Sequence, residues 1–206
     1  MRLYINVTIK LISHIKSLIY NNLDVLNMKI TISGTPGSGK SVVGRYLSKK
    51  LNLKYYGIGE LMREFASKHK LDLISLDKLL EKNKKLDKKF NEHIKRLDNK
   101  NNFVIDSRIG FLFIRNAVNI FLDADLDLRA KRIFKDKRKL ESYKTIKDVK
   151  KGISKRLMLE RKRFKKLYNV DFTDLKNYDL VINTTGMNVM IISNIILKYL
   201  NKNGIK

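Results

Sequence analysis

The chain has 206 residues and a net charge of +25, with 45 lysines and arginines against 20 acidic residues, and 43% of its residues are hydrophobic. This length and apolar content predict one folded domain with a sizeable core and argue against a disordered polycation. The chain has no cysteine, which excludes disulfides and thiolate metal sites and is what we expect of a cytoplasmic protein.

The first 27 residues are apolar but are interrupted by Lys10, His14 and Lys16. No uncharged run here is long enough to span a bilayer, and no small-residue cleavage site of a signal peptide follows. A peripheral amphipathic anchor remains an alternative. We expect residues 1–27 to be an N-terminal extension that is dispensable for catalysis, residues 28–206 to form the working domain, and no membrane association.

A glycine-rich turn separates a β-branched run at Lys29–Ser33 from an amphipathic helix pattern at Ser41–Leu51. The turn fits G-x-x-x-x-G-K-[ST] at every fixed position, which is the phosphate-loop motif of nucleoside triphosphatases and kinases. Its glycines let backbone N–H groups approach phosphate oxygens, and the following helix adds the positive end of its dipole. Lys40 is expected to reach the β- and γ-phosphates, and the Ser41 hydroxyl is expected to bind Mg²⁺. The motif therefore predicts that the loop holds the phosphates of a nucleoside triphosphate, and it does not distinguish a kinase from a GTPase or an ATP-driven motor.

The rest of the chain alternates short apolar runs with helical patterns, which predicts an α/β fold with a parallel sheet. Nearly continuous apolar runs are typical of strands that are buried on both faces. The five predicted strands are Lys29–Ser33, Leu53–Tyr56, Phe103–Asp106, Val118–Leu122 and Leu180–Asn183. The predicted helices are Ser41–Leu51, Gly59–His69, Ser75–Leu97, Leu126–Lys137, Ile146–Tyr168 and Asn188–Leu200.

Arginine is a minority among the cations, 12 against 33 lysines, yet it recurs shortly after predicted strands and on the later helices. A phosphorylated acceptor has to be held and its charge neutralised, and a guanidinium does this with two parallel hydrogen bonds. The recurring arginines therefore favour a second anionic substrate, whereas surface salt bridges are the alternative for each one alone. These arginines are Arg63, Arg108, Arg129, Arg132, Arg156 and Arg163, with Glu160 between the last two on one helix face.

Several blocks of the chain resemble cytidylate kinases of the archaeal type. They are "MKITISGTPGSGKSVVGRYLSKKLNLKYYGIGELMREFA", "VIDSR", "LDLRAKRI", "RLMLERKRFKKLYNVDFTDL" and "NYDLVINTT", in this order from Met28 onward. The resemblance implies a P-loop nucleoside monophosphate kinase fold, in which helices flank a five-stranded parallel sheet that carries a monophosphate-binding insert and a short lid. It implies transfer of a phosphoryl group from ATP, with Mg²⁺, to CMP or dCMP.

The resemblance also assigns roles to residues. The ATP-binding residues that it implies are Gly34, Thr35, Pro36, Gly37, Ser38, Gly39, Lys40, Ser41 and Val42. Lys40, Arg129, Arg156 and Arg163 are expected to supply catalytic cations, and Arg132 to join them on the lid side. The expected monophosphate site consists of Arg63, Asp106, Arg108, Arg132 and Glu160. Asp106 is expected either to orient the Mg²⁺ shell or to cap its strand, and Glu160 to lie near the base.

Three departures from the family pattern bear on the acceptor site. Asp106-Ser107-Arg108 replaces the usual Glu-Gly-Arg, Gly57-Ile58-Gly59-Glu60 lacks a common serine, and Leu157 stands where an acid is usual. Phosphate chemistry should survive these changes, whereas nucleotide selectivity is less secure.

The segment from residue 129 to residue 166 carries a charge of +14. Such a segment suits a basic lid that attracts ATP, and it would also suit a face that binds nucleic acid. An adenylate kinase or another small-molecule kinase on the same fold, or an RNA- or ribosome-associated P-loop protein, remain alternatives. We expect a monomeric kinase of ATP and CMP or dCMP without a stable nucleic-acid partner.

Overall fold

The computed structural model describes residues 27–136 and 143–204. The N-terminal extension, residues 1–26 of the predicted 1–27, and the end of the predicted helix Leu126–Lys137 lie outside the described residues. None of the described helices is long and apolar enough to cross a membrane.

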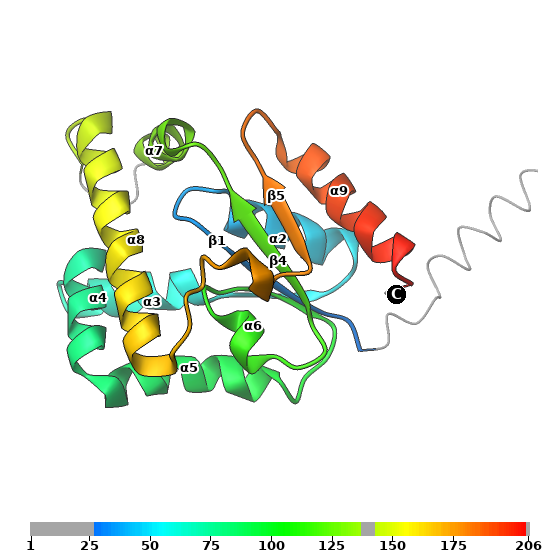
Figure 1. Cartoon of the computed structure of the whole chain (residues 1–206), viewed down its shortest axis with the longest axis horizontal. Helices are drawn as coiled ribbons and strands as arrows, with labels where there is room; N and C mark the ends of the chain where they lie inside the picture. Colours follow the sequence, from blue (N-terminus) through cyan, green and yellow to red (C-terminus); the bar gives the residue numbers. More distant parts are fainter. Residues whose placement is uncertain (1–26, 137–142, 205–206) are drawn as a thin grey trace, which may run out of the picture.

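Five parallel strands form a single sheet in the order β2-β3-β1-β4-β5 (Figure 1). The strands are β1 (Lys29–Gly34), β2 (Lys54–Gly57), β3 (Phe103–Asp106), β4 (Val118–Asp123) and β5 (Leu180–Asn183). β1 is central, and its residue Ile32 is in register with Asp106 on one side and Ile120 on the other. From β1 the chain passes to β2 at one edge, returns to β3 and then crosses to β4 and β5 on the other side of β1. The strand order therefore switches between β3 and β1, and a crevice opens at their carboxyl ends, where ligands bind in sheets of this kind.

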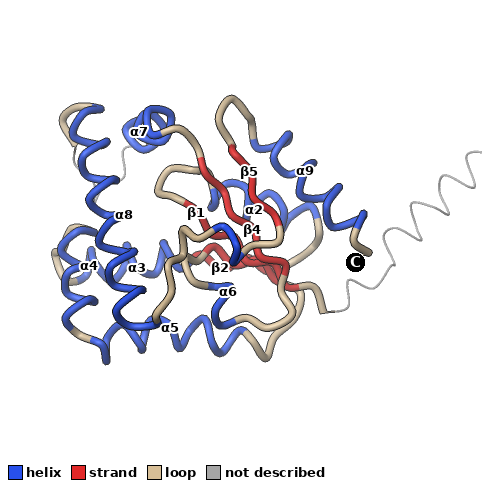
Figure 2. The backbone as a smooth tube through the Cα atoms, in the orientation of Figure 1, coloured by secondary structure: helices blue, strands red, loops and turns tan. Residues whose placement is uncertain are grey.

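The helices surround the strands, which lie at the centre of the molecule (Figure 2). They are α2 (Lys40–Lys50), α3 (Ile58–Lys68), α4 (Leu73–Lys82), α5 (Lys84–Leu97), α6 (Gly110–Phe113), α7 (Leu126–Lys135), α8 (Ile146–Tyr168) and α9 (Val189–Lys202), with a 3₁₀ turn, η1, at Leu175–Asn177. In Figure 1, α4 and α8 lie beside each other on the left of the sheet and α9 lies on its right. α4 and α8 therefore lie on the opposite side of the sheet from α9.

Two apolar layers hold the sheet. One face of the sheet packs against α2 and α9 through a cluster that includes Ile30, Leu47 and Ile196. α5 and α6 pack around Phe103 and Ile105 in a separate cluster. Most of these side chains are fully buried, so the crevice is built on rigid elements.

The helices α3 and α4 form a small apolar unit of their own. Met62 and Ala66 of α3 pack against Leu76 and Leu80 of α4. This unit lies between β2 and α5 in the chain. α7 and α8 pack together around Ile133 and Ile153.

The prediction of one helix over Ser75–Leu97 is wrong, because the chain breaks at Asn83 into α4 and α5. The backbone of Asn83 is not helical, with φ −108° and ψ 83°, and its side chain accepts a hydrogen bond from the Leu86 N–H at 2.9 Å. Asn83 is thus the N-cap of α5, a role that its short polar side chain favours. The short helix α6 was not predicted either.

Candidate functional site

The glycine-rich turn after β1 adopts a backbone that only glycine tolerates easily. Gly34, Gly37 and Gly39 have φ of 139°, 82° and 97°. A Cβ atom on Gly34 would lie 1.9 Å from the carbonyl oxygen of Leu122, so any side chain there would collide with β4. α2 begins directly after Gly39, with no side-chain cap and no acidic residue in its first turn. Its free N–H groups and dipole therefore remain available for an anion.

Lys40 lies back over this loop. Its Nζ donates a hydrogen bond to the Thr35 carbonyl oxygen at 2.7 Å, and its residue exposure is 8%. Burial lowers the pKa of Lys40 well below its usual value, and the positive charge of Arg108 adds to this effect. The negative charge of a phosphate beside the loop would raise the pKa of Lys40 again, so the position suits an anionic ligand.

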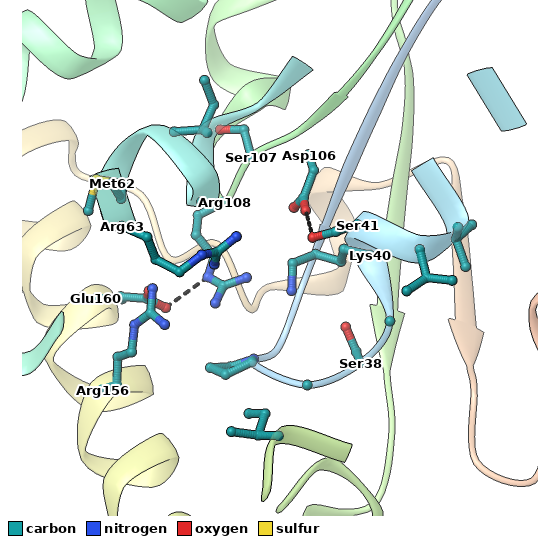
Figure 3. A pocket seen from close by; sticks show the side chains of 18 of the residues that line it. Ser38, Lys40, Ser41, Met62, Arg63, Asp106, Ser107, Arg108, Arg156 and Glu160 are labelled. Carbon is teal, nitrogen blue, oxygen red and sulfur yellow. Dashed lines mark hydrogen bonds and ion pairs between the residues drawn. The ribbon is translucent and has the colours of Figure 1, made fainter. Parts of the chain in front are cut away.

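Ser41 and Asp106 meet at the foot of the crevice. The Ser41 Oγ donates a hydrogen bond to Asp106 Oδ2 at 2.5 Å, and both residues line the same cavity (Figure 3). Oxygen atoms of this kind are the ligands that Mg²⁺ prefers. In the described residues, no group of three or more His, Asp or Glu side chains is placed to hold a metal. The pair therefore fits a Mg²⁺ ion that takes most of its ligands from a nucleotide.

A group of arginines surrounds Glu160 on the other side of the crevice. Arg108 Nε donates to Glu160 Oε2 at 2.8 Å, and Arg156 forms an ion pair with Glu160 Oε1 at 3.1 Å. Arg108 also donates to the Gly34 carbonyl oxygen at 2.6 Å, which connects this group to the phosphate loop. Figure 3 shows that the guanidinium groups of Arg63, Arg108 and Arg156 converge on one region from three different elements.

Glu160 is 2% exposed, and both of its oxygens are engaged by arginines. Burial alone would raise the pKa of Glu160, but the charges of Arg108 and Arg156 outweigh burial and lower it to about 2. The carboxylate is therefore ionised, and its contacts hold the arginines in place. This geometry favours a positioning role for Glu160 over the contact with a base that the sequence predicts.

These two groups face a single cavity of about 710 Å³. One end is lined by the phosphate loop. The other end passes the arginines and reaches apolar side chains of α3, α4, α5 and α8, among them Met62, Leu80, Phe90 and Phe164. A cavity with a phosphate-binding end, a second cationic group and an apolar end suits two phosphorylated substrates in line.

Arg163 of α8 is more buried than the sequence predicts for a cation of the lid. Its side chain is 4% exposed, and its NH1 donates to Asp77 Oδ1 of α4 at 2.8 Å. Its Nε lies 3.5 Å from Asp87 Oδ1 of α5. Burial raises the pKa of Asp77 to about 6, although Arg163 acts in the opposite direction. Arg163 thus joins α8 to α4 and α5, and it also lines the cavity.

Arg129 and Arg132 of α7 lie against the phosphate loop. Arg129 Nε donates to the Ala124 carbonyl oxygen at 2.8 Å, and its NH1 lies 3.5 Å from the Pro36 carbonyl oxygen. Arg132 NH1 and NH2 donate to the Thr184 hydroxyl and carbonyl oxygens, each at 3.1 Å. Arg132 lines the cavity on the loop side, whereas Arg129 supports the loop from behind.

Sequence reasoning missed three polar residues of α5 and α8: Asp87, Asn91 and Tyr168. Tyr168 donates to Asp87 Oδ2 at 2.5 Å, and Asn91 Nδ2 donates to Asp87 Oδ2 at 2.9 Å and to the Tyr168 hydroxyl at 2.7 Å. Asp87 and Asn91 are 2% and 6% exposed and line the apolar end of the cavity. The one available signal was an acid four residues before an amide, at i and i+4 on a helix.

Residues 29–186 match the model of the family described as "Cytidylate kinase-like family". A cytidylate kinase of Sulfurisphaera tokodaii is 40% identical over 177 residues, which cover 84% of this chain and 96% of that protein. A protein of Lacinutrix mariniflava named S-adenosylmethionine-dependent nucleotide dehydratase is 34% identical over 179 residues, covering 86% of this chain and 37% of that protein. The sequence's resemblance to cytidylate kinases is confirmed by these matches.

Among solved structures, a shikimate kinase from Acinetobacter baumannii in complex with shikimate superimposes with a TM-score of 0.56. The match covers 88% of this chain and 97% of that chain at 17% identity, so it shows a shared fold. Together with the sheet order, it confirms the predicted α/β fold of five parallel strands flanked by helices.

Proposed function

The chain belongs to the cytidylate kinase-like family, and on this premise we propose that it transfers the terminal phosphoryl group of ATP to CMP and dCMP. The observation that carries the proposal is the shared cavity, in which the phosphate loop and the group of Arg63, Arg108 and Arg156 face each other. One end binds the triphosphate and the other binds the phosphate of the acceptor. The products are ADP and the pyrimidine nucleoside diphosphate.

On the donor side, the backbone N–H groups of the loop and the N-terminus of α2 hold the phosphates of ATP. Lys40 leaves the Thr35 carbonyl and binds the β- and γ-phosphates, where negative charge shifts during transfer. Arg132 contributes a cation above the loop, and Arg129 keeps the loop in place through the Ala124 and Pro36 carbonyl oxygens. Interactions that strengthen in the transition state are the ones that accelerate transfer.

On the acceptor side, Arg63 and Arg108 bind the phosphate of the monophosphate, and Arg156 bridges toward the transferred group. Glu160 holds Arg108 and Arg156 in this arrangement, so little reorganisation is needed when substrates bind. Phosphoryl transfer requires alignment and charge neutralisation, and no nucleophilic side chain is needed.

The Ser41 hydroxyl and the Asp106 carboxylate are the residues that would hold Mg²⁺ or its water shell. The ion, when bound with ATP, neutralises phosphate charge and orients the β- and γ-phosphates. Asp106 meanwhile fixes the Ser41 side chain toward the loop, and this contact connects the end of β3 to the start of α2.

A coupled assay that measures ADP release tests the proposal with ATP, Mg²⁺ and a panel of CMP, dCMP, UMP, AMP and GMP. We expect CMP to be the best acceptor, with dCMP close behind. Arg108→Ala should lower kcat/KM for every acceptor, by about 10²-fold for loss of one charged contact to the reacting phosphates.

Arg115→Ala is a matched control, because the Arg115 side chain is 79% exposed, pairs with Asp98 and does not line the cavity. It should leave turnover unchanged. If AMP proves the best acceptor, the pyrimidine assignment is wrong. If no monophosphate is phosphorylated, the kinase proposal itself fails.

A further inference from the structure

The cavity has a polar group at its apolar end that the phosphate chemistry does not use. Asp87 and Asn91 of α5 line this cavity together with Met62, Leu80 and Phe90. Both are buried, and a buried carboxylate among apolar side chains is costly unless it is hydrogen-bonded. The position of this group relative to the arginines indicates what part of the acceptor would meet it.

The cavity-facing residues of α8 show the direction. Arg156 and Glu160 stand beside the phosphate-binding arginines, and Arg163, seven residues after Arg156, stands beside Asp87. Seven residues of α-helix extend about 10 Å, so the backbone of Arg163, beside Asp87, lies further along α8 than the backbone of Arg156. The two guanidinium groups themselves both pair with Asp77, at 3.5 Å for Arg156 and 2.8 Å for Arg163. A nucleoside monophosphate carries its phosphate at one end and its base at the other. An acceptor whose phosphate meets Arg63 and Arg108 would therefore direct its base toward α5.

The hydrogen bonds of Asp87 engage one of its oxygens, whereas the other is held only by the ion pair with Arg163. Oδ2 accepts from Tyr168 and from Asn91, which fixes the carboxylate. Oδ1 accepts no hydrogen bond from any residue in the described ranges and lies 3.5 Å from Arg163 Nε. The side-chain amide oxygen Oδ1 of Asn91 likewise accepts no hydrogen bond within the described part of the chain. Two acceptor atoms thus remain at the base end of the cavity.

We infer that Asp87, held by Tyr168 and Asn91, selects the base by accepting a hydrogen bond from its exocyclic amine. This inference rests on the proposed function and assigns the selectivity of the same site. Cytosine carries a 4-amino donor, whereas uracil carries a carbonyl oxygen at the same position, which a carboxylate repels. Glu160 is less suited to this role, because arginines hold its two oxygens at 2.8 and 3.1 Å, whereas Arg163 Nε lies 3.5 Å from Asp87 Oδ1.

Asp87→Asn tests the inference, because the amide has nearly the same shape and can donate to the uracil oxygen. We expect kcat/KM for CMP to fall about 10- to 100-fold, the loss of one hydrogen bond to a charged group, and kcat/KM for UMP to rise. The change should lie mainly in KM. Tyr168→Phe removes only the hydroxyl that fixes Asp87 and should shift the CMP-to-UMP ratio in the same direction by less.

Asp77→Asn is the matched control. Asp77 is a buried carboxylate that pairs with the same Arg163, but it does not line the cavity. It should affect CMP and UMP by the same factor. The inference is overturned if Asp87→Asn lowers kcat/KM for CMP and for UMP by the same factor, or if Asp77→Asn shifts the CMP-to-UMP ratio as much as Asp87→Asn does. Asp87 would then only connect helices.

Calorimetric binding of cytidine and uridine separates this inference from the kinase proposal, since nucleosides carry no phosphate to transfer. We expect the wild-type protein to bind cytidine more tightly and Asp87→Asn to lose that preference. An equal preference in both proteins overturns the inference even where CMP is phosphorylated. A lost preference supports it even where no acceptor is turned over.

Discussion

Replacing Glu160 with glutamine would test whether this carboxylate positions the acceptor arginines. The substitution keeps the size of the side chain and removes its charge. Glu160 is almost fully buried and is the common partner of Arg108 and Arg156. Its loss removes a counter-charge that two guanidinium groups share, whereas Arg156 keeps its ion pair with Asp77.

The magnitude follows from the ionisation of Glu160. Burial would raise its pKa, but Arg108 and Arg156 lower it to about 2, from an ordinary value of 4.5. This difference corresponds to roughly 3 kcal/mol in favour of the folded state at neutral pH. Breaking a buried ion pair by removing one partner costs about 3–5 kcal/mol, which agrees. We therefore expect Glu160→Gln to lower the free energy of unfolding by roughly 3 kcal/mol at pH 7.

The pH dependence gives the sign. Because the pKa is lower in the folded state, the stabilisation is complete above about pH 4.5 and is lost as the pH falls toward 2. Urea unfolding should show that the difference in the free energy of unfolding between wild type and Glu160→Gln is roughly half as large at pH 3 as at pH 7. Glu92→Gln, at an exposed position on α5, is the control and should show no gap at either pH.

Kinetics with CMP and UMP complete the test. If Glu160 holds the arginines, Glu160→Gln should raise KM for both acceptors by about 10-fold and leave their ratio unchanged. A change in the ratio with little change in stability would refute this reasoning. Such a result would instead support the contact between Glu160 and the base that is expected from the sequence.

Two further predictions concern the phosphate loop. Lys40→Ala should lower kcat by about 10²-fold or more with the melting temperature retained, and a variant with wild-type turnover would refute the assignment of the loop. Gly34→Ala should lower the free energy of unfolding by more than about 3 kcal/mol in urea titrations, since its Cβ would meet the Leu122 carbonyl at 1.9 Å. Gly186→Ala, with φ of 71° and nothing within 4 Å, should cost only about 1–2 kcal/mol of backbone strain, and equal losses would contradict the collision.

The strands and the loop were predictable because their signals are local. Phe103–Asp106 and Leu180–Asn183 have the predicted bounds, since apolar runs between polar turns are typical of strands buried in a parallel sheet. The fixed spacing of the loop motif encodes its geometry directly. The break at Asn83 was harder to predict, because lysines flank it and apolar residues continue at helical spacing on both sides.

The contacts of the acceptor side could not be read from the sequence, because they join residues far apart in the chain. Arg163 and Asp77 are 86 positions apart, and Tyr168 and Asp87 are 81 positions apart. Asp77 and Asp87 stand in lysine-rich helices, where an acid is usually a surface residue. Their burial depends on how α8 packs against α4 and α5, which is a tertiary property.

The structure also separates two sources of the strong positive charge. Among the residues that the structure describes, five of 10 arginines line the cavity, against two of 28 lysines. A surplus of cations spread by composition alone would place lysines there in proportion. The arginines are gathered where two phosphorylated substrates would have to approach each other, and each planar guanidinium can be fixed by a carboxylate and still present donors. The lysines, which lie mostly outside the cavity, contribute long-range attraction for anions.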